Sequence, residues 1–491
     1  MKLSLLLKQV PVQNTYEDRE ITFITDDSRK IQPGCAFVCI KGNHFDGHDA
    51  AFDAVRRGAA AVIVQHSVGC EGEVITSNIR AAYSLMCAAF FGEPAKKLRL
   101  IGVTGTNGKT TTTFLIKEIL DMFGKKSGLI GTVVNMIDRQ TEPAALTTPE
   151  SFALQQLFAK MVQAGCEYCV MEVSSQALSQ GRVEGCMFEV AVFTNLTQDH
   201  LDYHGNFENY AAAKAILFSQ CKKAVLNSDD PAWHRMIRDS SCPYVTYAQK
   251  QQADYRAAEI QYAQTGVRYQ LRHGEQSLDT AIGIPGEFSV YNSLCAITAL
   301  AELGFSLADI VEKAAKVRGV KGRIEVVPTD TDYVVIIDYA HSPDGLENIL
   351  KAVRPITKGR VLTVFGCGGD RDRTKRPLMG KVAASLSDYL FVTSDNPRTE
   401  QPEAIIADIL AGLKDCSVPM VVEPSRTLAI QAALNEAKAG DTVLLAGKGH
   451  ETYQILGTEK IHYDEREIVR DILAGKTGNE RSETHGSNQP E

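Results

Sequence analysis

A glycine-rich segment that ends in Gly-Lys-Thr carries the clearest chemical signal in this sequence of 491 residues. It follows an apolar run that predicts a strand (LRLIGVTG) and precedes a run with helical spacing (TTFLIKEILDMF). In such a P-loop, backbone N–H groups and the start of the helix hold phosphate oxygens, Lys109 reaches the β and γ phosphates, and Thr110 binds Mg²⁺. The predicted phosphate-binding residues are Gly105, Thr106, Asn107, Gly108, Lys109, Thr110 and Thr111. Val103 stands where the common motif has its first glycine, and the motif alone is compatible with kinases, GTPases, ATPases and ligases.

Three further polar motifs lie in the last third of the chain, each after an apolar run that predicts a strand. They are Gly369-Asp370-Arg371-Asp372, Asp395-Asn396-Pro397-Arg398 and Gly447-Lys448-Gly449-His450-Glu451. Loops at the carboxyl ends of parallel strands are where such sheets bind ligands. We therefore expect a second binding site here, although the Asp-Asn-Pro-Arg motif is also compatible with a structural turn.

The elements that must position these motifs predict an α/β protein of three domains. Residues 1–97 mix short apolar runs with turn signals and predict a small α/β domain. Residues 98–327 predict a central P-loop domain with a mostly parallel sheet, and residues 328–475 predict a C-terminal, Rossmann-like α/β domain. Residues 476–491 are polar, and they predict a disordered tail to which we assign no function.

The composition excludes several classes of protein. A formal net charge of −8 with 23% charged residues argues against a dominant nucleic-acid-binding surface. No stretch reaches the ~18 apolar residues of a membrane span, and the N-terminus lacks a small-residue cleavage site, so we expect a cytoplasmic protein. The twelve cysteines form no disulfide framework. Cys166 and Cys169 form a C-x-x-C pair, but they lie in a predicted buried strand, and we expect reduced thiols.

The variant T-G-T-N-G-K-T-T of the P-loop resembles the Mur ligase family and its relative folylpolyglutamate synthase. Both use ATP to activate a carboxylate, so the resemblance implies an ATP-dependent, amide-forming ligase. It extends over nearly the whole chain up to the tail, in the order and spacing of the family. Short motifs of the first domain, such as Asp27-Ser28-Arg29 and Asp46-Gly47-His48, resemble the uridine-nucleotide motifs, and Ser28 is an implied UDP contact.

The resemblance also implies where a UDP-muramoyl dipeptide would bind. The implied contacts in the central domain are Thr147, Thr148, Ser174, Gln180 and Arg182. Arg182 suits this role because a guanidinium can bind a carboxylate or a phosphate in a bidentate manner. The family often has a histidine where this chain has Gln176, which cannot titrate, so we assign that position no acid–base role.

Metal and nucleotide contacts follow from the same resemblance. The implied metal ligands are Thr110, Glu172, His200 and a carbamylated Lys214, and the implied catalytic residues are Lys109, Glu172, His200 and Lys214. Lys214 matches a family lysine that CO₂ converts into a carbamate, an anionic oxygen ligand for Mg²⁺. On their own, His200 and Lys214 would be interpreted as structural residues. Asn292 is implied on the adenine side of ATP, and Asp338 and His341 are implied to face the nucleotide.

The Asp-Asn-Pro-Arg motif resembles the signature of the family members that add diaminopimelate. The implied contacts are Arg371, Asp395, Asn396, Pro397, Arg398, Gly447 and Glu451. Meso-diaminopimelate has a second carboxylate where lysine has only an ammonium, and Arg398 would pair with that carboxylate. Glu451 would bind the distal amino group.

The implied reaction transfers the γ-phosphoryl group of ATP to the D-glutamate of UDP-MurNAc-L-Ala-D-Glu, and the amine of diaminopimelate then attacks the acyl phosphate. Lys109 and Mg²⁺ would offset the charge. A monomer without nucleic-acid or membrane partners is expected. The alternatives are a lysine-adding ligase, folylpolyglutamate synthase, whose relation would leave the uridine-type first domain unexplained, and a non-catalytic nucleotide-binding relative.

Overall fold

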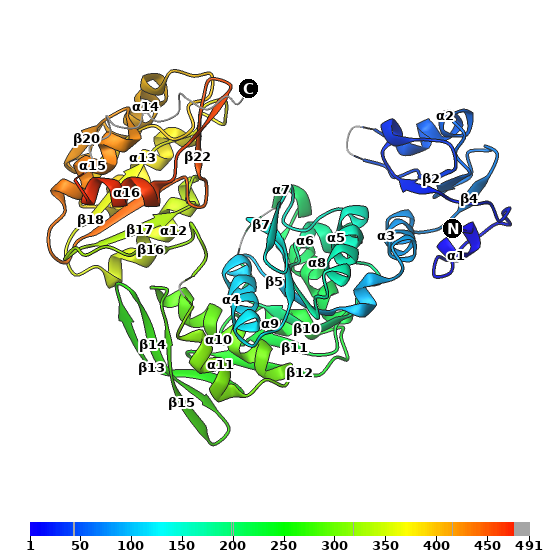
Figure 1. Cartoon of the computed structure of the whole chain (residues 1–491), viewed down its shortest axis with the longest axis horizontal. Coiled ribbons are helices and arrows are strands. Elements are labelled where there is room, and N and C mark those ends of the chain that lie inside the picture. Colours follow the sequence, from blue (N-terminus) through cyan, green and yellow to red (C-terminus); the bar gives the residue numbers. More distant parts are fainter. Residues whose placement is uncertain (43–44, 198, 200, 318, 415, 476–491) are drawn as a thin grey trace, which may run out of the picture. The chain divides into compact units, whose positions relative to one another are not determined.

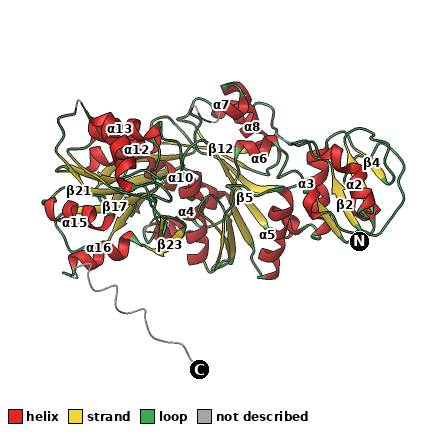
Figure 2. Cartoon of the chain, turned by 90° about the horizontal axis from the view of Figure 1, so that it is seen from above, coloured by secondary structure: helices red, strands yellow, loops and turns green. Residues whose placement is uncertain are grey.

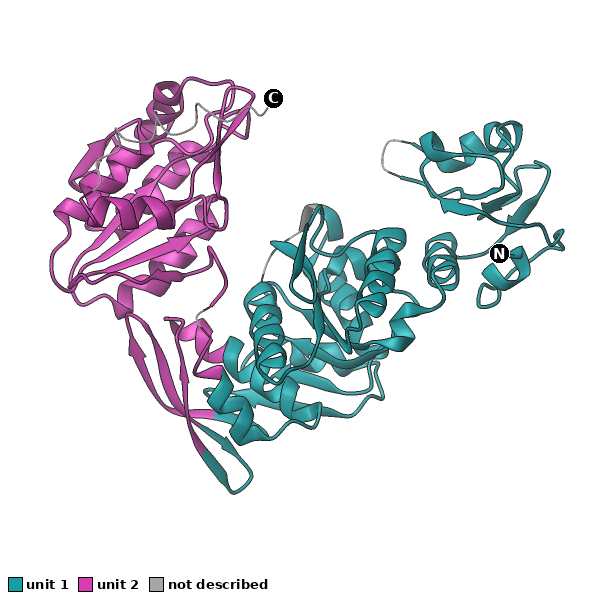
Figure 3. Ribbon diagram, in the orientation of Figure 1, with its two compact units in different colours: residues 1–256, 271–277, 292–313 teal, residues 257–270, 278–291, 314–491 magenta. Residues whose placement is uncertain are grey.

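The computed structural model describes residues 1–42, 45–197, 199, 201–317, 319–414 and 416–475 (Figure 1). The chain forms two compact units, shown in Figure 3. Unit 1 comprises residues 1–256, 271–277 and 292–313, and unit 2 comprises residues 257–270, 278–291 and 314–475 of the described chain. His200 and the tail 476–491 lie outside the described residues. Among those described, no helix is long and apolar enough to cross a membrane.

The N-terminal part of unit 1 contains a four-stranded parallel sheet in the order β1-β2-β3-β4. The strands are β1 (Phe23–Thr25), β2 (Cys35–Val38), β3 (Ala61–Val64) and β4 (Glu73–Ile75). Every residue of β2 and β3 is buried, as expected for apolar runs in a sheet that is covered on both faces. The helices here are α1 (Leu3–Leu6), α2 (Ala51–Arg56) and α3 (Ile79–Phe90), with the 3₁₀ turns η1 (Ser28–Lys30), η2 (Gly47–Ala50) and η3 (Pro94–Lys97).

A larger sheet of unit 1 has the order β12-β11-β10-β5-β9-β6-β7-β8. The strands are β5 (Arg99–Thr104), β6 (Ser127–Ile130), β7 (Val134–Ile137), β8 (Gln140–Pro143), β9 (Tyr168–Glu172), β10 (Phe188–Phe193), β11 (Ala224–Asn227) and β12 (Tyr244–Ala248). β7 pairs in antiparallel fashion with both β6 and β8, and the pairs from β12 to β6 are parallel. The chain proceeds to both sides of β5, which makes its carboxyl end a switch point of the kind where such sheets bind ligands.

The helices that accompany this sheet begin with α4, directly after β5. They are α4 (Lys109–Met122), α5 (Ser151–Gln163), α6 (Ser175–Ser179), α7 (Leu201–His204), α8 (Phe207–Ser219), α9 (Trp233–Ile237), α10 (Glu287–Glu302) and α11 (Leu307–Ala314). The larger sheet and its helices enclose a core that includes Phe158, Phe188 and Phe193. Strands β13 (Tyr255–Ala263), β14 (Gly266–His273) and β15 (Gln276–Ile282) have residues in both units.

Unit 2 contains a six-stranded sheet in the order β16-β17-β21-β18-β19-β20, in which only β16 is antiparallel. The strands are β16 (Glu325–Val327), β17 (Val334–Asp338), β18 (Val361–Phe365), β19 (Tyr389–Val392), β20 (Met420–Val422) and β21 (Thr442–Ala446). A hairpin follows, formed by β22 (Tyr453–Leu456) and β23 (Glu459–His462). The prediction of an α/β fold with a mostly parallel central sheet is confirmed.

Helices cover both faces of the six-stranded sheet. Figure 2 shows α12 (Pro343–Val353) and α13 (Lys375–Leu386) on one side of β17 and β21, and α15 (Arg426–Glu436) and α16 (Glu465–Leu473) on the other. The remaining elements are α14 (Pro402–Leu410), η4 (Arg354–Ile356) and η5 (Ala411–Leu413). Separate apolar cores lie on the two faces. The parallel strands β17, β18, β19 and β21 therefore bring their carboxyl ends to one edge.

All twelve cysteines are free, and ten of them are buried. Cys166 and Cys169 belong to that group, and Cys169 lies in the buried strand β9, as the sequence predicted.

Candidate functional site

The P-loop joins β5 to α4 and closes tightly around the start of the helix. Lys109 donates from Nζ to the carbonyl oxygens of Gly105 and Thr106 at 2.9 and 2.8 Å. Gly105 and Gly108 have φ angles of 147° and 84°. A Cβ at Gly108 would lie 2.4 Å from Oδ1 of Asn292, so the loop requires glycine there, and Asn292 of α10 lies against it.

A segment after β10 holds the P-loop in place. The Asn195 side chain accepts from the amide of Asn107 at 2.9 Å and donates to the carbonyl of Asn107 at 3.1 Å. The amide of Thr106 donates to the carbonyl of Asn195 at 2.8 Å, and Thr194 donates to the carbonyl of Asn107 at 2.6 Å. Neither Thr194 nor Asn195 was singled out in the sequence. The signal that could have identified them is their position: they are polar residues directly after the apolar strand β10, which pairs with β5.

Glu172 is a buried carboxylate surrounded by hydroxyl and amide donors beside the P-loop. It ends β9, is 1% exposed, and accepts from Oγ1 of Thr110 at 3.0 Å. Thr132 donates to it from the backbone amide at 2.9 Å and from Oγ1 at 3.1 Å. Thr110 and Glu172 thus present oxygen ligands of the type that Mg²⁺ prefers, beside a loop built for phosphate. Thr132 was missed in the sequence.

No group of three histidine, cysteine or acidic side chains able to hold a metal ion occurs among the residues that the structure describes. Mg²⁺ is commonly held by one or two carboxylates together with substrate phosphates and water. The residues present at Thr110 and Glu172 therefore suit Mg²⁺ bound together with ATP. The predicted ligand His200 lies outside the described residues.

Lys214 of α8 also contacts the P-loop. It is 1% exposed, donates from Nζ to the carbonyl of Gly105 at 2.8 Å, and lies 4.5 Å above the ring of Tyr210. Burial and the nearby Lys109 ammonium hold the pKa of Lys214 well below its ordinary value, with an opposing contribution from Asp199. The lowered pKa increases the share of the neutral amine, the form that reacts with CO₂.

The residues predicted to bind the muramoyl dipeptide form one connected cluster. Thr148 donates from Oγ1 to the carbonyl of Glu172 at 2.9 Å and accepts from the amide of Ser174 at 3.0 Å. Arg182 donates to Oε1 of Gln180 at 2.7 and 3.0 Å and to the carbonyl of Thr148 at 2.9 Å. Backbone and side-chain contacts therefore connect Arg182 with the backbone of Glu172, the residue whose carboxylate lies beside the P-loop.

Two other predicted residues, Thr147 and Ser28, have different partners. Thr147 lies 3.1 Å from Thr132 through their hydroxyl groups. Ser28 stands at the start of η1, where its carbonyl accepts from Nη1 of Arg57 at 2.7 Å. In the described part of the chain, no hydrogen bond connects Ser28 with the predicted dipeptide contacts.

A second site lies where the strands of the six-stranded sheet end. Its pocket has a volume of about 250 Å³. The lining residues are Tyr339, His341, Gly368, Arg371, Lys375, Asp395, Asn396, Arg398, Gly447 and Glu451. Six of these are predicted diaminopimelate contacts, and the structure brings them together from three separate loops. Pro397 does not line the pocket, and its carbonyl lies against Gly369.

Arg398 is held in the pocket by its backbone. Its φ is +52°, its amide donates to the carbonyl of Ile455 at 3.1 Å, and its carbonyl accepts from Gly457 at 2.8 Å. The guanidinium donates from Nη1 to the carbonyl of Gly369 at 2.8 Å. Since no carboxylate among the described residues pairs with it, Arg398 can take an anionic group of a ligand.

The carboxylate of Glu451, which is opposite in charge to Arg398, lines the same pocket. Nδ2 of Asn396 donates to Oε2 of Glu451 at 2.9 Å. The pocket therefore combines a cationic guanidinium with an anionic carboxylate, and it suits a ligand end that carries both a carboxylate and an ammonium.

Buried polar residues form hydrogen bonds at the strand ends that carry these loops. Nε of Arg426 donates to Oε1 of Glu465 at 2.7 Å, and both side chains are fully buried. Arg426 also donates to the carbonyl of Ala446 at 3.0 Å, directly before the Gly447 loop. At the end of β17, Asp338 accepts from the amides of Ile324 and Ala340 at 2.9 Å each. Burial raises the pKa of Asp338.

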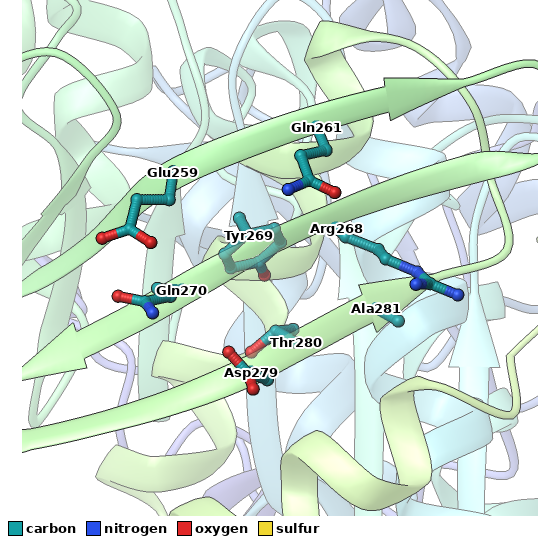
Figure 4. A pocket seen from close by; sticks show the side chains of 8 residues that line it. All are labelled: Glu259, Gln261, Arg268, Tyr269, Gln270, Asp279, Thr280 and Ala281. Carbon is teal, nitrogen blue, oxygen red and sulfur yellow. The ribbon is translucent and has the colours of Figure 1, made fainter.

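A further hollow, of about 350 Å³, lies on the face of β13, β14 and β15. Figure 4 shows the side chains that line it, among them Glu259, Arg268 and Asp279. No residue predicted from the sequence to bind or react lies there.

Three family models match the chain in sequence order. Residues 20–89 match the catalytic domain of the Mur ligase family, residues 103–300 the Mur ligase middle domain, and residues 322–449 the Mur ligase glutamate ligase domain.

Individual relatives match over nearly the full length. A UDP-N-acetylmuramoyl-L-alanyl-D-glutamate--2,6-diaminopimelate ligase of Geobacillus thermodenitrificans is 46% identical over 484 residues, covering 96% of this chain and 99% of the relative. A ligase of the same name from Synechococcus elongatus is 47% identical over 495 residues, with coverages of 96% and 99%. A solved structure of such a ligase superimposes with a TM-score of 0.75 at 33% identity and covers 97% of this chain and 99% of that one.

Proposed function

The chain belongs to the Mur ligase family, and from this premise we propose that it joins meso-diaminopimelate to the D-glutamate of UDP-MurNAc-L-Ala-D-Glu with consumption of ATP. The observation that carries the proposal is the pocket in which Arg398 and Glu451 present opposite charges. The named activity of the full-length relatives agrees with it.

The first step belongs to the P-loop. Transfer of the γ-phosphoryl group to the D-glutamate side chain gives ADP and an acyl phosphate. Lys109 would offset charge on the phosphates, while the backbone from Gly105 to Thr111 cradles them and Asn292 contacts the adenine side. Thr110 and Glu172 would hold Mg²⁺, which supplies charge neutralisation and Lewis-acid polarisation of the phosphate oxygens.

Lys214 and His200 complete this proposed centre. The buried, low-pKa amine of Lys214 supports its conversion by CO₂ into a carbamate, which would present oxygen ligands in place of a cation. His200 is proposed as a ligand of a second ion by resemblance to the family.

The nucleotide substrate would extend from the first sheet to the P-loop. Ser28 is the proposed uridine-side contact, and the connected cluster of Thr147, Thr148, Ser174, Gln180 and Arg182 is the proposed contact of the dipeptide. The hydrogen bond from Thr148 to the backbone carbonyl of Glu172 supports this assignment, because Glu172 also carries the carboxylate that would hold Mg²⁺.

In the second step the free amine of diaminopimelate attacks the acyl carbon, and the tetrahedral intermediate collapses to the amide and phosphate. Arg398 and Arg371 would bind the distal carboxylate, Glu451 the distal ammonium, and Asp395, Asn396, Pro397 and Gly447 would shape the loops around them. Positioning and electrostatics carry such a reaction, and no enzyme nucleophile is required. We also propose that the reaction takes place in the cytoplasm and that the protein acts as a monomer.

The proposal is tested by ADP release from the purified protein with Mg²⁺, ATP and UDP-MurNAc-L-Ala-D-Glu. Meso-diaminopimelate and L-lysine are compared at equal concentration, and the product is identified by mass. Preference for diaminopimelate by a factor of at least about 100 is expected. Preference for lysine would preserve the ligase and overturn the substrate assignment, and no turnover with either would indicate a non-catalytic relative.

A further inference from the structure

A buried lysine lies next to the pocket that contains Arg398 and Glu451, hereafter the amino-acid pocket, without lining it. Lys448 follows β21, and its side chain is fully buried. Its Nζ lies 3.1 Å from Oδ1 of Asn396 and 3.2 Å from Oε2 of Glu451. A buried ammonium requires such partners, because unpaired burial of a charge is costly. Two residues of the proposed substrate site therefore compensate the buried charge of Lys448, and Lys448 in turn holds their side chains in place.

Lys448 fixes the direction of the Asn396 amide. Oδ1 of Asn396 accepts from Nζ of Lys448 and from the backbone amide of Ile455, which lies 3.0 Å away. Since both donors face this oxygen, the opposite side of the amide, Nδ2, faces Glu451 at 2.9 Å. Exchange of the two ends would set donors against donors.

The same lysine determines which oxygen of Glu451 meets a ligand. Oε2 accepts from both Lys448 and Asn396, whereas Oε1 has the hydroxyl of Tyr453 at 3.4 Å. The rings of Tyr453 and Tyr463 lie 5.7 Å from Nζ and enclose the ammonium. Oε1 is thus the oxygen with more capacity for a substrate ammonium.

Lys448 also adds to the charge balance of the pocket. The lining contains three cations, Arg371, Lys375 and Arg398, and two carboxylates, Asp395 and Glu451. Lys448 adds a further cation directly behind Glu451. The pocket therefore has a surplus of positive charge. This surplus disfavours a ligand end that carries only an ammonium, and it attracts the carboxylate of an end that carries both groups.

We propose that Lys448 is a positioning residue that fixes Asn396 and Glu451 for the amino-acid substrate. We also propose that its charge favours a terminus with both an ammonium and a carboxylate over an ammonium alone. The inference rests on the proposed function, and it concerns a residue that touches the contacts of the substrate rather than the substrate.

The test compares wild type with Lys448→Met, which removes both the charge and the hydrogen bonds, and with Lys448→Gln, which removes the charge but keeps a hydrogen-bonding group. ADP release gives KM for each of the three substrates and the ratio of kcat/KM for meso-diaminopimelate over L-lysine. Arg360→Met is the matched control, because Arg360 pairs with Asp441 and Glu436 at the opposite ends of the strands.

For Lys448→Met we expect KM for diaminopimelate to rise on the order of tenfold and the selectivity ratio to fall by a similar factor, with KM for the other two substrates unchanged. Lys448→Gln should lose as much selectivity with a smaller rise in KM, and it replaces the methionine variant if that variant does not fold. An unchanged ratio, or an equal rise of all three KM values, would overturn the inference alone. Wild type that prefers lysine, or that releases no ADP, would overturn the proposed function and this inference with it.

Discussion

Lys109 and Lys214 direct two amino groups at one carbonyl oxygen, that of Gly105. Two ammonium groups this close repel each other, and Lys214 is the more deeply buried. The proton is therefore lost from Lys214 more readily than from an ordinary lysine. A neutral amine adds to the carbon of CO₂ and releases one proton, which leaves a carbamate.

This chemistry predicts a carbamate signal from Lys214. In ¹³C-labelled bicarbonate, the carbon NMR spectrum of the wild-type protein should show a carbamate resonance that Lys214→Arg lacks. Because the folded pKa is lowered, a larger share of the amine is neutral than in an ordinary lysine, and the signal should decline as pH falls through that pKa and the amine becomes protonated. A spectrum without this resonance at pH 8 would contradict the prediction.

Arg398 gives the second prediction at the residue scale. Arg398→Lys removes the planar fork that can bind a carboxylate through two hydrogen bonds. We expect kcat/KM for meso-diaminopimelate to fall by a factor on the order of 100, while turnover of L-lysine changes by less than about threefold. Steady-state ADP release measures both.

The control for this experiment is Arg373→Lys. Arg373 is more exposed, pairs with Asp408 and does not line the pocket, so its replacement should leave both rates unchanged. Equal losses with diaminopimelate and lysine in Arg398→Lys would show that the residue acts on folding rather than on recognition.

At the scale of the element, α4 begins at the P-loop and carries a largely buried carboxyl group in its second half. Its first residue, Lys109, belongs to the P-loop, and Glu118 lies further along the helix. Burial, with a contribution from Asp121, raises the pKa of Glu118 to about 7. The folded helix therefore favours the protonated form of a carboxyl group that ionises near 4.5 when the chain is unfolded.

Glu118→Gln should remove this pH dependence. In wild type, the stability associated with protonated Glu118 is fully present below pH 4.5 and is lost as pH rises through 7. We expect the glutamine variant to be more stable by about 1 to 3 kcal/mol at pH 8 and equal to wild type near pH 4.5. Urea unfolding at the two pH values measures this, with the exposed Glu17→Gln as control. A gain of equal size at both values would contradict the argument.

The sequence predicted the elements whose signal is local. Apolar runs gave β5, β9, β17, β18, β19 and β21, and the motifs after them gave most of the pocket that contains Arg398 and Glu451. It did not single out Thr132 or Asn195, because their roles arise from the pairing of distant strands. The polar strands β13–β15 were missed for a related reason: their side chains alternate toward solvent and form no apolar run.

At the scale of the whole molecule, the proposed functions are divided between the two units. The P-loop, Glu172 and Lys214 lie in unit 1, and every residue of the amino-acid pocket lies in unit 2. The larger sheet of unit 1 and the six-stranded sheet of unit 2 have separate buried cores. Binding of one ligand can therefore stabilise one unit before the other.

Hydrogen exchange should reveal this division. A non-hydrolysable ATP analogue with Mg²⁺ is expected to slow exchange in residues 105–111 and around Glu172, and to leave β18, β19 and β21 unchanged. The Lys109→Ala variant, with weakened phosphate binding, should show much less protection at the same ligand concentration. Equal protection of both units by the nucleotide alone would contradict the prediction.

The backbone of Arg398 has a consequence for how this ligase could change its substrate. A left-handed conformation costs a residue other than glycine about 1 kcal/mol, so the proposed binding of a second carboxylate by Arg398 is retained at a cost to the stability of the fold. A descendant that no longer used diaminopimelate would gain stability by accepting glycine at this position. Loss of the proposed specificity would then increase the stability of the fold. Arg398 must therefore be maintained by selection for the product that contains diaminopimelate.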